Sequence, residues 1–226
     1  AGHYLSGRKG PHGRKPSEMI AEAIRELDIL KTFAPTAERL SLLGGACKRL
    51  AFVTTGDERR RALASMADDY REAHDIIYAG GKGGIDPYPL FNWLTAEILC
   101  AEYGVKRGKE RPRGFLALVD RWCTKARAAA AEKEGRDPDF WNSLAQSDAC
   151  LVHALARKSF DRDMESVIGG YKRARERGAS PREFRSVIEH LDFLIKMTAE
   201  APKKETLQKE LKALRALKDK LAAIGE

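Results

Sequence analysis

The sequence has none of the short motifs that mark the common catalytic and metal sites. Its histidines lie far apart, and none belongs to an HExxH pair or to another two-ligand helix spacing: His3, His12, His74, His153 and His190. It also has no GxSxG nucleophile motif and no GxGxxG dinucleotide motif. We therefore expect a protein that is not an enzyme and that has neither a metal nor a cofactor.

A phosphate-binding loop is missing as well, although one stretch looks similar to it. GGKGG at 80–84 places Lys82 before Gly83, whereas a P-loop requires Ser or Thr after the lysine to bind magnesium. No strand pattern precedes the stretch. We interpret it as a loop that joins two helical segments.

Long apolar runs, paired cysteines and aromatic residues are also scarce. No stretch approaches the ~20 apolar residues that a membrane span needs, so we predict no membrane association. The four cysteines show no CxxC spacing, which predicts reduced, buried thiols and a cytoplasmic protein. Aromatic residues make up 8% of the chain, while Ala, Leu, Lys, Arg and Glu are common. This composition favours helices over sheets.

The formal charge of +8 lies mainly at the two ends of the chain. Residues 1–15 carry four basic side chains and no acidic one, and we interpret them as a flexible tail. The region between the ends is nearly neutral, which argues against a nucleic-acid-binding face along it. The segment 104–114 carries five basic residues and one acid. It keeps open a second hypothesis, that of a basic helical-repeat RNA-binding protein.

One pattern occurs three times with every internal spacing kept, and the copies are offset by 53 and 48 residues. The first copy comprises Leu40, Leu43, Gly44, Cys47, Met66, Tyr70 and Ala73. The second comprises Trp93, Ala96, Glu97, Cys100, Val119, Cys123 and Ala126. The third comprises Trp141, Leu144, Ala145, Asp148, Val167, Tyr171 and Ala174. Repeats with such a period are typical of solenoids built from stacked units.

The pattern predicts an all-α fold, an α-solenoid of about three extended helix pairs with capping helices at both ends. We expect a single helical repeat domain over 16–226, with units at about 36–79, 86–133 and 137–178 and terminal helices over 181–224. The first helix, which begins at Pro16, covers one end of the array. The last helix carries a leucine stripe, which is typical of a terminal cap or of a coiled-coil arm.

These residues resemble the tetratricopeptide repeat (TPR), which carries W-x2-L-G-x2-Y on its first helix and A-x3-F-x2-A on its second. The two signatures lie ten residues further apart here than in the usual 34-residue unit. The stretches 38–51, 86–99 and 139–181 are similar to long bacterial TPR modules related to the TRAF-binding regulatory region of MAP3 kinases. This likeness covers roughly residues 17–197.

The resemblance implies a scaffold or regulatory module that binds a partner protein or peptide and regulates an effector in bacterial signalling or defence. Groove positions carried over from the repeat are Glu38, Ser41, Lys48, Arg49, Asn142 and Gln146. Among them Lys48 and Arg49 favour an acidic peptide. An ordinary solvated helix surface explains these residues equally well. We also expect Tyr70, Trp93, Trp141 and Tyr171 to be buried between helices.

Overall fold

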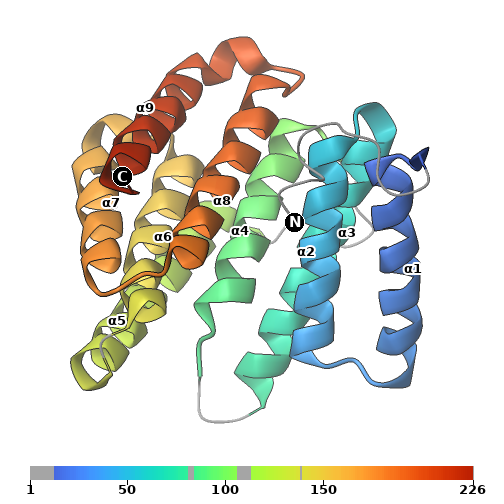
Figure 1. The fold of residues 1–226 in the computed structure, drawn as a ribbon, viewed down its shortest axis with the longest axis horizontal. Helices are drawn as coiled ribbons and strands as arrows, with labels where there is room; N and C mark the ends of the chain where they lie inside the picture. Colours follow the sequence, from blue (N-terminus) through green and yellow to red (C-terminus); the bar gives the residue numbers. More distant parts are fainter. Residues whose placement is uncertain (1–12, 81–83, 106–112, 138, 226) are drawn as a thin grey trace. The chain divides into compact units, whose positions relative to one another are not determined.

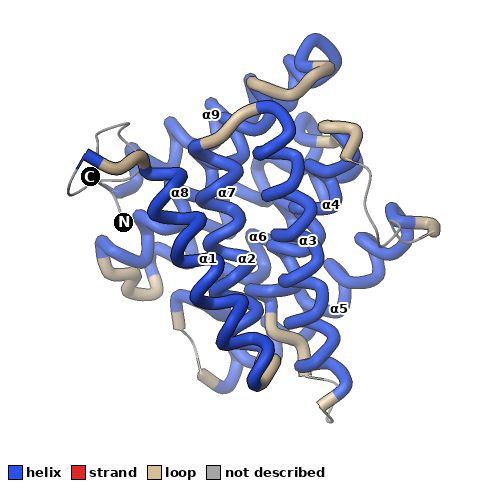
Figure 2. Tube along the Cα trace, turned by 90° about the vertical axis from the view of Figure 1, so that its right-hand side faces the viewer, coloured by secondary structure: helices blue, strands red, loops and turns tan. Residues whose placement is uncertain are grey.

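A computed structural model describes residues 13–80, 84–105, 113–137 and 139–225, and these residues form nine α-helices and one short 3₁₀ helix. Within these ranges the chain has no strand, as Figures 1 and 2 show. The predicted fold class, an all-α helical repeat, is therefore confirmed. Most of the predicted basic tail lies outside the described residues, as do Lys82 and the centre of the basic 104–114 segment.

The described chain falls into two compact units, residues 1–109 and residues 110–226. The helices of the first unit are α1 (Pro16–Phe33), α2 (Ala37–Val53), α3 (Gly56–Ala79) and α4 (Pro87–Glu102). Consecutive helices in this unit pack against one another. Side chains fix two of the helix starts, because Thr36 accepts a hydrogen bond from the Arg39 backbone N–H and Asp86 accepts one from that of Tyr88.

The helices of the second unit are α5 (Phe115–Arg136), α6 (Phe140–Arg157), α7 (Phe160–Glu176), α8 (Pro181–Ala199), η2 (Lys204–Leu207) and α9 (Gln208–Gly225). Here α6 packs on α5 and α7, and α9 packs on α7 and α8. The boundary between the units falls inside the predicted repeat 86–133. A single continuous domain over 16–226 stays a prediction.

The threefold pattern marks positions in the cores of the two units. Of its twenty-one positions, nineteen are buried, among them Tyr70 and Tyr171 with no exposed surface and Trp93 with 3%. The two positions that are not buried are Trp141 and Asp148. The Asp148 carboxylate accepts a hydrogen bond from the Tyr171 hydroxyl at 2.7 Å. The spacing in the sequence therefore reports which residues face a neighbouring helix.

Two glycines permit the closest helix contacts. A Cβ atom on Gly44 would lie 2.6 Å from the ring of Tyr70, and one on Gly170 would lie 2.2 Å from the Ser147 hydroxyl. Both positions are in helix interiors, where glycine costs up to ~1 kcal/mol relative to alanine. The close approach of α3 to α2, and of α7 to α6, explains why no larger residue fits.

The prediction that Trp141 is buried is wrong, because 51% of its surface is exposed. Helix α6 begins at Phe140, so Trp141 lies in its first turn, whereas the equivalent Trp93 lies seven residues into α4. Phe140 is 4% exposed and occupies the interior position instead. The two rings meet edge to face with their centroids 5.0 Å apart.

Candidate partner-binding face

Five side chains from three helices of the first unit form a basic and phenolic cluster. They are Lys48 and Arg49 on α2, Tyr70 on α3, and Tyr88 and Asn92 on α4, and we call them the α2–α4 face. The Lys48 ammonium donates to the Asn92 side-chain oxygen at 3.2 Å. The Tyr70 and Tyr88 hydroxyls lie 3.1 Å apart within hydrogen-bonding distance. The cluster therefore links the first helices of two successive pairs.

The centre of the α2–α4 face is Gly45. A Cβ atom placed there would lie 3.5 Å from an Arg49 guanidinium nitrogen, 3.5 Å from the Tyr70 hydroxyl and 3.8 Å from the Tyr88 hydroxyl. Tyr88 is 55% exposed, whereas Tyr70 is buried. Three polar groups thus converge on a point of the backbone that carries no side chain of its own.

The electrostatics of this cluster favour an anionic group. Burial raises the pKa of the Tyr70 phenol well above its usual value, and the neighbouring Tyr88 hydroxyl raises it further, while the Arg49 charge acts in the opposite direction. Tyr70 therefore keeps its proton at neutral pH and can donate a hydrogen bond to the exposed Tyr88 hydroxyl. An ammonium, a guanidinium and a neutral hydroxyl are donors suited to a carboxylate, because charge-assisted bonds of this kind are the stronger ones.

The four predicted residues of α2 lie on one stripe of that helix, because their spacing follows the helical repeat. Glu38 and Arg49 are exposed, while Ser41 and Lys48 are half-buried. Of these four predicted groove residues, Lys48 and Arg49 belong to the α2–α4 face, while Glu38 and Ser41 lie closer to the N-terminal end of α2. Whether they contact a partner stays a prediction.

The other two predicted residues lie on α6 in the second unit. The side-chain amide of Asn142 donates to the Asp137 carbonyl at 3.0 Å, and that of Gln146 donates to the Glu134 carboxylate. Glu134 also accepts from the Ser143 hydroxyl at 2.8 Å. Asn142 and Gln146 thus join α6 to the end of α5, and their role in partner binding stays a prediction.

Sequence reasoning missed Tyr70, Tyr88 and Asn92 as members of the face. The place of Tyr70 in the repeat predicts a core residue, which is correct for its ring but says nothing of its hydroxyl. Tyr88 and Asn92 have no position in the repeated pattern. Only the packing of α4 beside α2 and α3 brings them to Gly45.

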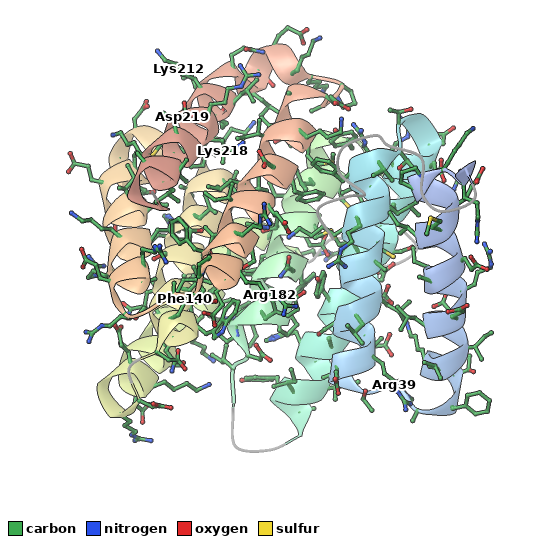
Figure 3. The ribbon with its side chains drawn as sticks, viewed as in Figure 1. Arg39, Phe140, Arg182, Lys212, Lys218 and Asp219 are labelled. Carbon is green, nitrogen blue, oxygen red and sulfur yellow. The ribbon has the colours of Figure 1, made fainter. Side chains whose placement is uncertain are left out.

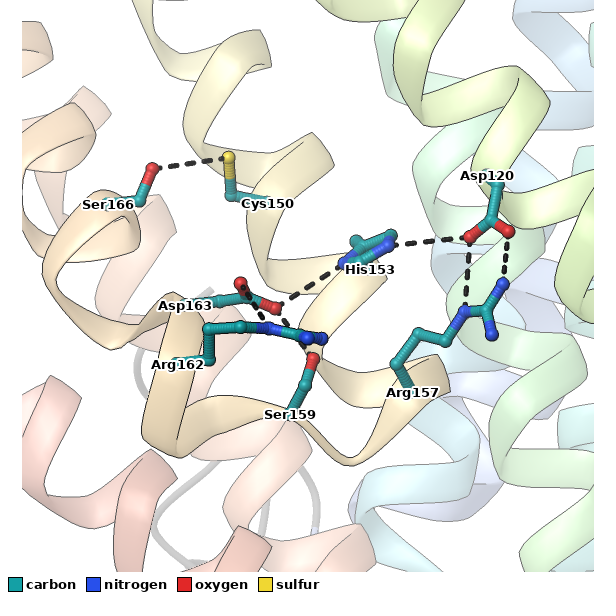
Figure 4. A network of polar contacts seen from close by, with 8 residues as sticks. All are labelled: Asp120, Cys150, His153, Arg157, Ser159, Arg162, Asp163 and Ser166. Carbon is teal, nitrogen blue, oxygen red and sulfur yellow. Dashed lines mark hydrogen bonds and ion pairs between the residues drawn. The ribbon is translucent and has the colours of Figure 1, made fainter.

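A second polar network lies in the second unit around His153, as Figure 4 shows. The two ring nitrogens of His153 are each 3.4 Å from a carboxylate oxygen, one of Asp120 on α5 and one of Asp163 on α7. Arg157 forms a two-pronged ion pair with Asp120, and the Ser159 hydroxyl donates to Asp163 at 2.6 Å. The network ties α6 to both neighbouring helices.

Within the described ranges no three metal-ligating side chains gather into a potential site. The four cysteines are free thiols, and Cys47, Cys100 and Cys123 are buried. Burial raises the pKa of Cys47 and of Cys123 from 9.0 to about 12, so both stay protonated at neutral pH. A protonated thiol is a poor nucleophile.

Comparison with known proteins gives one family. Residues 6–97 match the model of the Tetratricopeptide Repeats-Sensor family, a stretch that includes α1, α2, α3 and most of α4. No curated protein and no solved structure matches the chain. The match supports the assignment to the TPR superfamily, while the finer resemblance to the regulatory region of MAP3 kinases stays a prediction. Among the described helices none is long and apolar enough to cross a membrane.

Proposed function

We propose that this chain is a protein-interaction or regulatory module whose α2–α4 face binds an acidic segment of a partner protein. The observation that carries the proposal is the convergence of Arg49 and the Tyr70 and Tyr88 hydroxyls over the buried Gly45, where Arg49 and Tyr88 are exposed to solvent. Lys48 lies beside them, bonded to Asn92. The whole face falls inside the residues that match the sensor family.

An acidic peptide fits this face better than a neutral one. Two cations, the half-buried Lys48 and the exposed Arg49, stand on one stripe of α2. A carboxylate can accept from Arg49 and from a phenolic hydroxyl at the same time, whereas a neutral amide gains less from the guanidinium.

We propose further that the chain acts by binding and not by catalysis. In this account the bound segment belongs to an attached or neighbouring effector, whose activity the module regulates in bacterial signalling or defence. Binding of the acidic segment then signals that the effector is present. The RNA-binding alternative rests on the 104–114 segment, most of whose basic residues lie outside the described ranges, and it stays a prediction.

Selection from a random peptide library tests the acidic specificity without a known partner. Peptides selected on the wild-type chain should be enriched in Asp and Glu. The charge reversals Lys48→Glu and Arg49→Glu should each lower the affinity of a selected peptide by about tenfold or more. Arg61→Glu, at an exposed position of α3, makes the same charge change away from the face and should leave the affinity unchanged.

Two results would contradict the proposal. One is a set of selected peptides without an acidic excess. The other is equal binding of an acidic peptide by the wild-type chain and both reversed variants. An RNA oligonucleotide whose binding falls steeply with salt, and is unaffected by Lys48→Glu, would favour the alternative function instead.

A further inference from the structure

Helix α1 is held less firmly than the other helices of the described chain. Every residue of α1 is described and none is buried. Its apolar side chains Ile20, Ile24 and Leu27 are half-buried, while Ile29, Leu30 and Phe33 are exposed by 58%, 46% and 81%. A segment with few buried apolar contacts opens locally at low cost. Helix α1 is therefore the helix of the described chain that should open most readily.

The contact that fixes α1 to α3 is an ion pair. The Lys31 ammonium lies 3.0 Å from an Asp69 oxygen and 3.3 Å from a Glu72 oxygen. Asp69 is only 7% exposed, and its second oxygen lies 3.9 Å from the Cys47 sulfur on α2. The ammonium of α1 thus fills a recess whose walls come from α2 and α3.

This recess requires a cation. Burial raises the pKa of Asp69 even with Lys31 bonded to it. For Lys31, burial opposes the charged form, but attraction to Asp69 and Glu72 prevails and its pKa is raised. A carboxylate left buried without a counter-charge is costly. The charged Asp69 carboxylate is therefore stabilised either by a basic side chain in the recess or by water when the recess opens.

A second contact recognises the end of a helix and not a particular side chain. The Arg39 guanidinium, on the first turn of α2, donates to the carbonyl oxygens of Leu30 at 3.3 Å and Ala34 at 2.8 Å. Figure 3 labels Arg39. These carbonyls lie at the C-terminal end of α1, where a cation is favoured, and the Leu30 carbonyl also accepts from the Ala34 backbone N–H at 3.4 Å. Any helix ending at the same place can offer the same acceptors.

We propose that α1 occupies, within the chain itself, a docking face for a partner helix that carries a basic residue in its last turn. The face consists of the apolar side of α2, the Asp69 and Glu72 carboxylates and the Arg39 guanidinium. Its ligand is an amphipathic helix with apolar residues spaced as Ile20, Ile24 and Leu27 are, followed four residues later by Lys or Arg. Such helix-in-groove recognition uses anchors at these intervals.

Because α1 already fills the face, an incoming helix has to displace it. The apparent affinity for the incoming helix is lowered by the fraction of molecules in which the face is open. Any change that releases α1 therefore raises the affinity. This inference does not rest on the acidic-segment function, because the α2–α4 face uses other side chains and a ligand of opposite charge.

A peptide of residues 16–34, labelled at its N-terminus with fluorescein, provides the probe. Full-length chain carrying Lys31→Glu should release its own α1, because the new carboxylate faces Asp69 and Glu72. We expect this chain to bind the peptide at least about tenfold more tightly than the wild-type chain does, measured by fluorescence anisotropy. The same peptide with Lys31→Glu should bind neither chain.

The matched control is the full-length chain with Arg25→Glu, which makes the same charge change at an exposed position of α1. It should bind the peptide as weakly as the wild-type chain. If Lys31→Glu fails to fold by circular dichroism, Lys31→Gln removes the charge with less repulsion and should show the same direction. Equal peptide affinity of the wild-type chain and a folded Lys31 variant would overturn the proposal, as would tighter binding by Arg25→Glu.

Discussion

The two terminal helices differ in how they are held, although both are 18 residues long and amphipathic. Helix α9 packs on both α7 and α8, and its Leu211, Leu214, Leu217 and Leu221 are at most 6% exposed. Helix α1 packs on α2 and buries no residue. A terminal helix with four buried leucines stays in place as a cap, whereas one that buries no side chain can be exchanged.

The energies involved separate the two helices clearly. Full burial of a leucine side chain stabilises a protein by ~1.5 to 3 kcal/mol. The four leucines of α9 together resist removal of that helix. Helix α1 depends instead on half-buried side chains and on the Lys31 ion pair with Asp69 and Glu72. The predictions below test this contrast between buried and exposed anchors.

The largest effect should come from the two tryptophans at equivalent positions of the repeat. Trp93→Ala should lower the free energy of unfolding by ~3 to 5 kcal/mol, because its ring is buried. Trp141→Ala should cost less than ~1 kcal/mol, since half of the ring already faces solvent. Urea unfolding of both variants measures the difference. Equal losses would contradict the placement of α6.

The next effect compares the terminal helices directly. Leu217→Ala on α9 removes a side chain with no exposed surface and should cost ~2 to 5 kcal/mol. Leu30→Ala on α1 removes one that is 46% exposed and should cost less than ~1 kcal/mol. Thermal unfolding serves as the measurement. If Leu30→Ala proved as damaging as Leu217→Ala, α1 would be an integral part of the core.

A smaller effect concerns two buried thiols, Cys47 beside the Lys31 recess and Cys123 on α5. Both have a pKa raised by burial from 9.0 to about 12, so the folded state favours the protonated thiol. The contribution of these thiols to the free energy of unfolding should be complete below pH 9. It should fall as the pH rises from about 9 towards 12. The variants Cys47→Ala and Cys123→Ala should each make this fall less steep in urea unfolding at pH 10. An unchanged slope in both would contradict the burial of these thiols.

The alkylation rates of the same two thiols test whether α1 opens locally. Cys47 and Cys123 are 3% and 4% exposed, so static burial predicts equal alkylation rates. If α1 opens locally, iodoacetamide should modify Cys47 faster than Cys123, and Arg39→Ala should accelerate only Cys47. Mass spectrometry of the digested protein follows both sites. Equal rates, unaffected by Arg39→Ala, would show that α1 does not open.

Much of the fold could be predicted from the sequence, because the repeat spacing records which side chains face a neighbouring helix. The threefold pattern predicted the burial of Tyr70, Trp93 and Tyr171 correctly. It failed at Trp141, since a spacing does not say where a helix begins, and α6 begins with Phe140 turned inwards. The predicted stripe on α2 lies at a real cluster, but Tyr88 and Asn92 depend on packing between helices and leave no periodic signal.

The sequence also does not predict the difference in burial between α1 and α9. Both helices carry apolar residues at three- and four-residue intervals, which identifies a face but not the number of helices that cover it. Only the structure shows that α9 lies against two helices. It also shows that Lys31, an ordinary residue in the sequence, is the cation of a recess formed by Asp69 and Glu72.

Amide hydrogen exchange of the wild-type chain tests the central claim most directly, because it measures the opening of α1 and α9 in one experiment. We predict that the amides of α1 exchange through local opening, far faster than those of α9, and that added urea hardly changes their rate. The amides of α9 should exchange only by an opening that urea strongly promotes. Equal protection and equal urea dependence in the two helices would contradict an exchangeable α1.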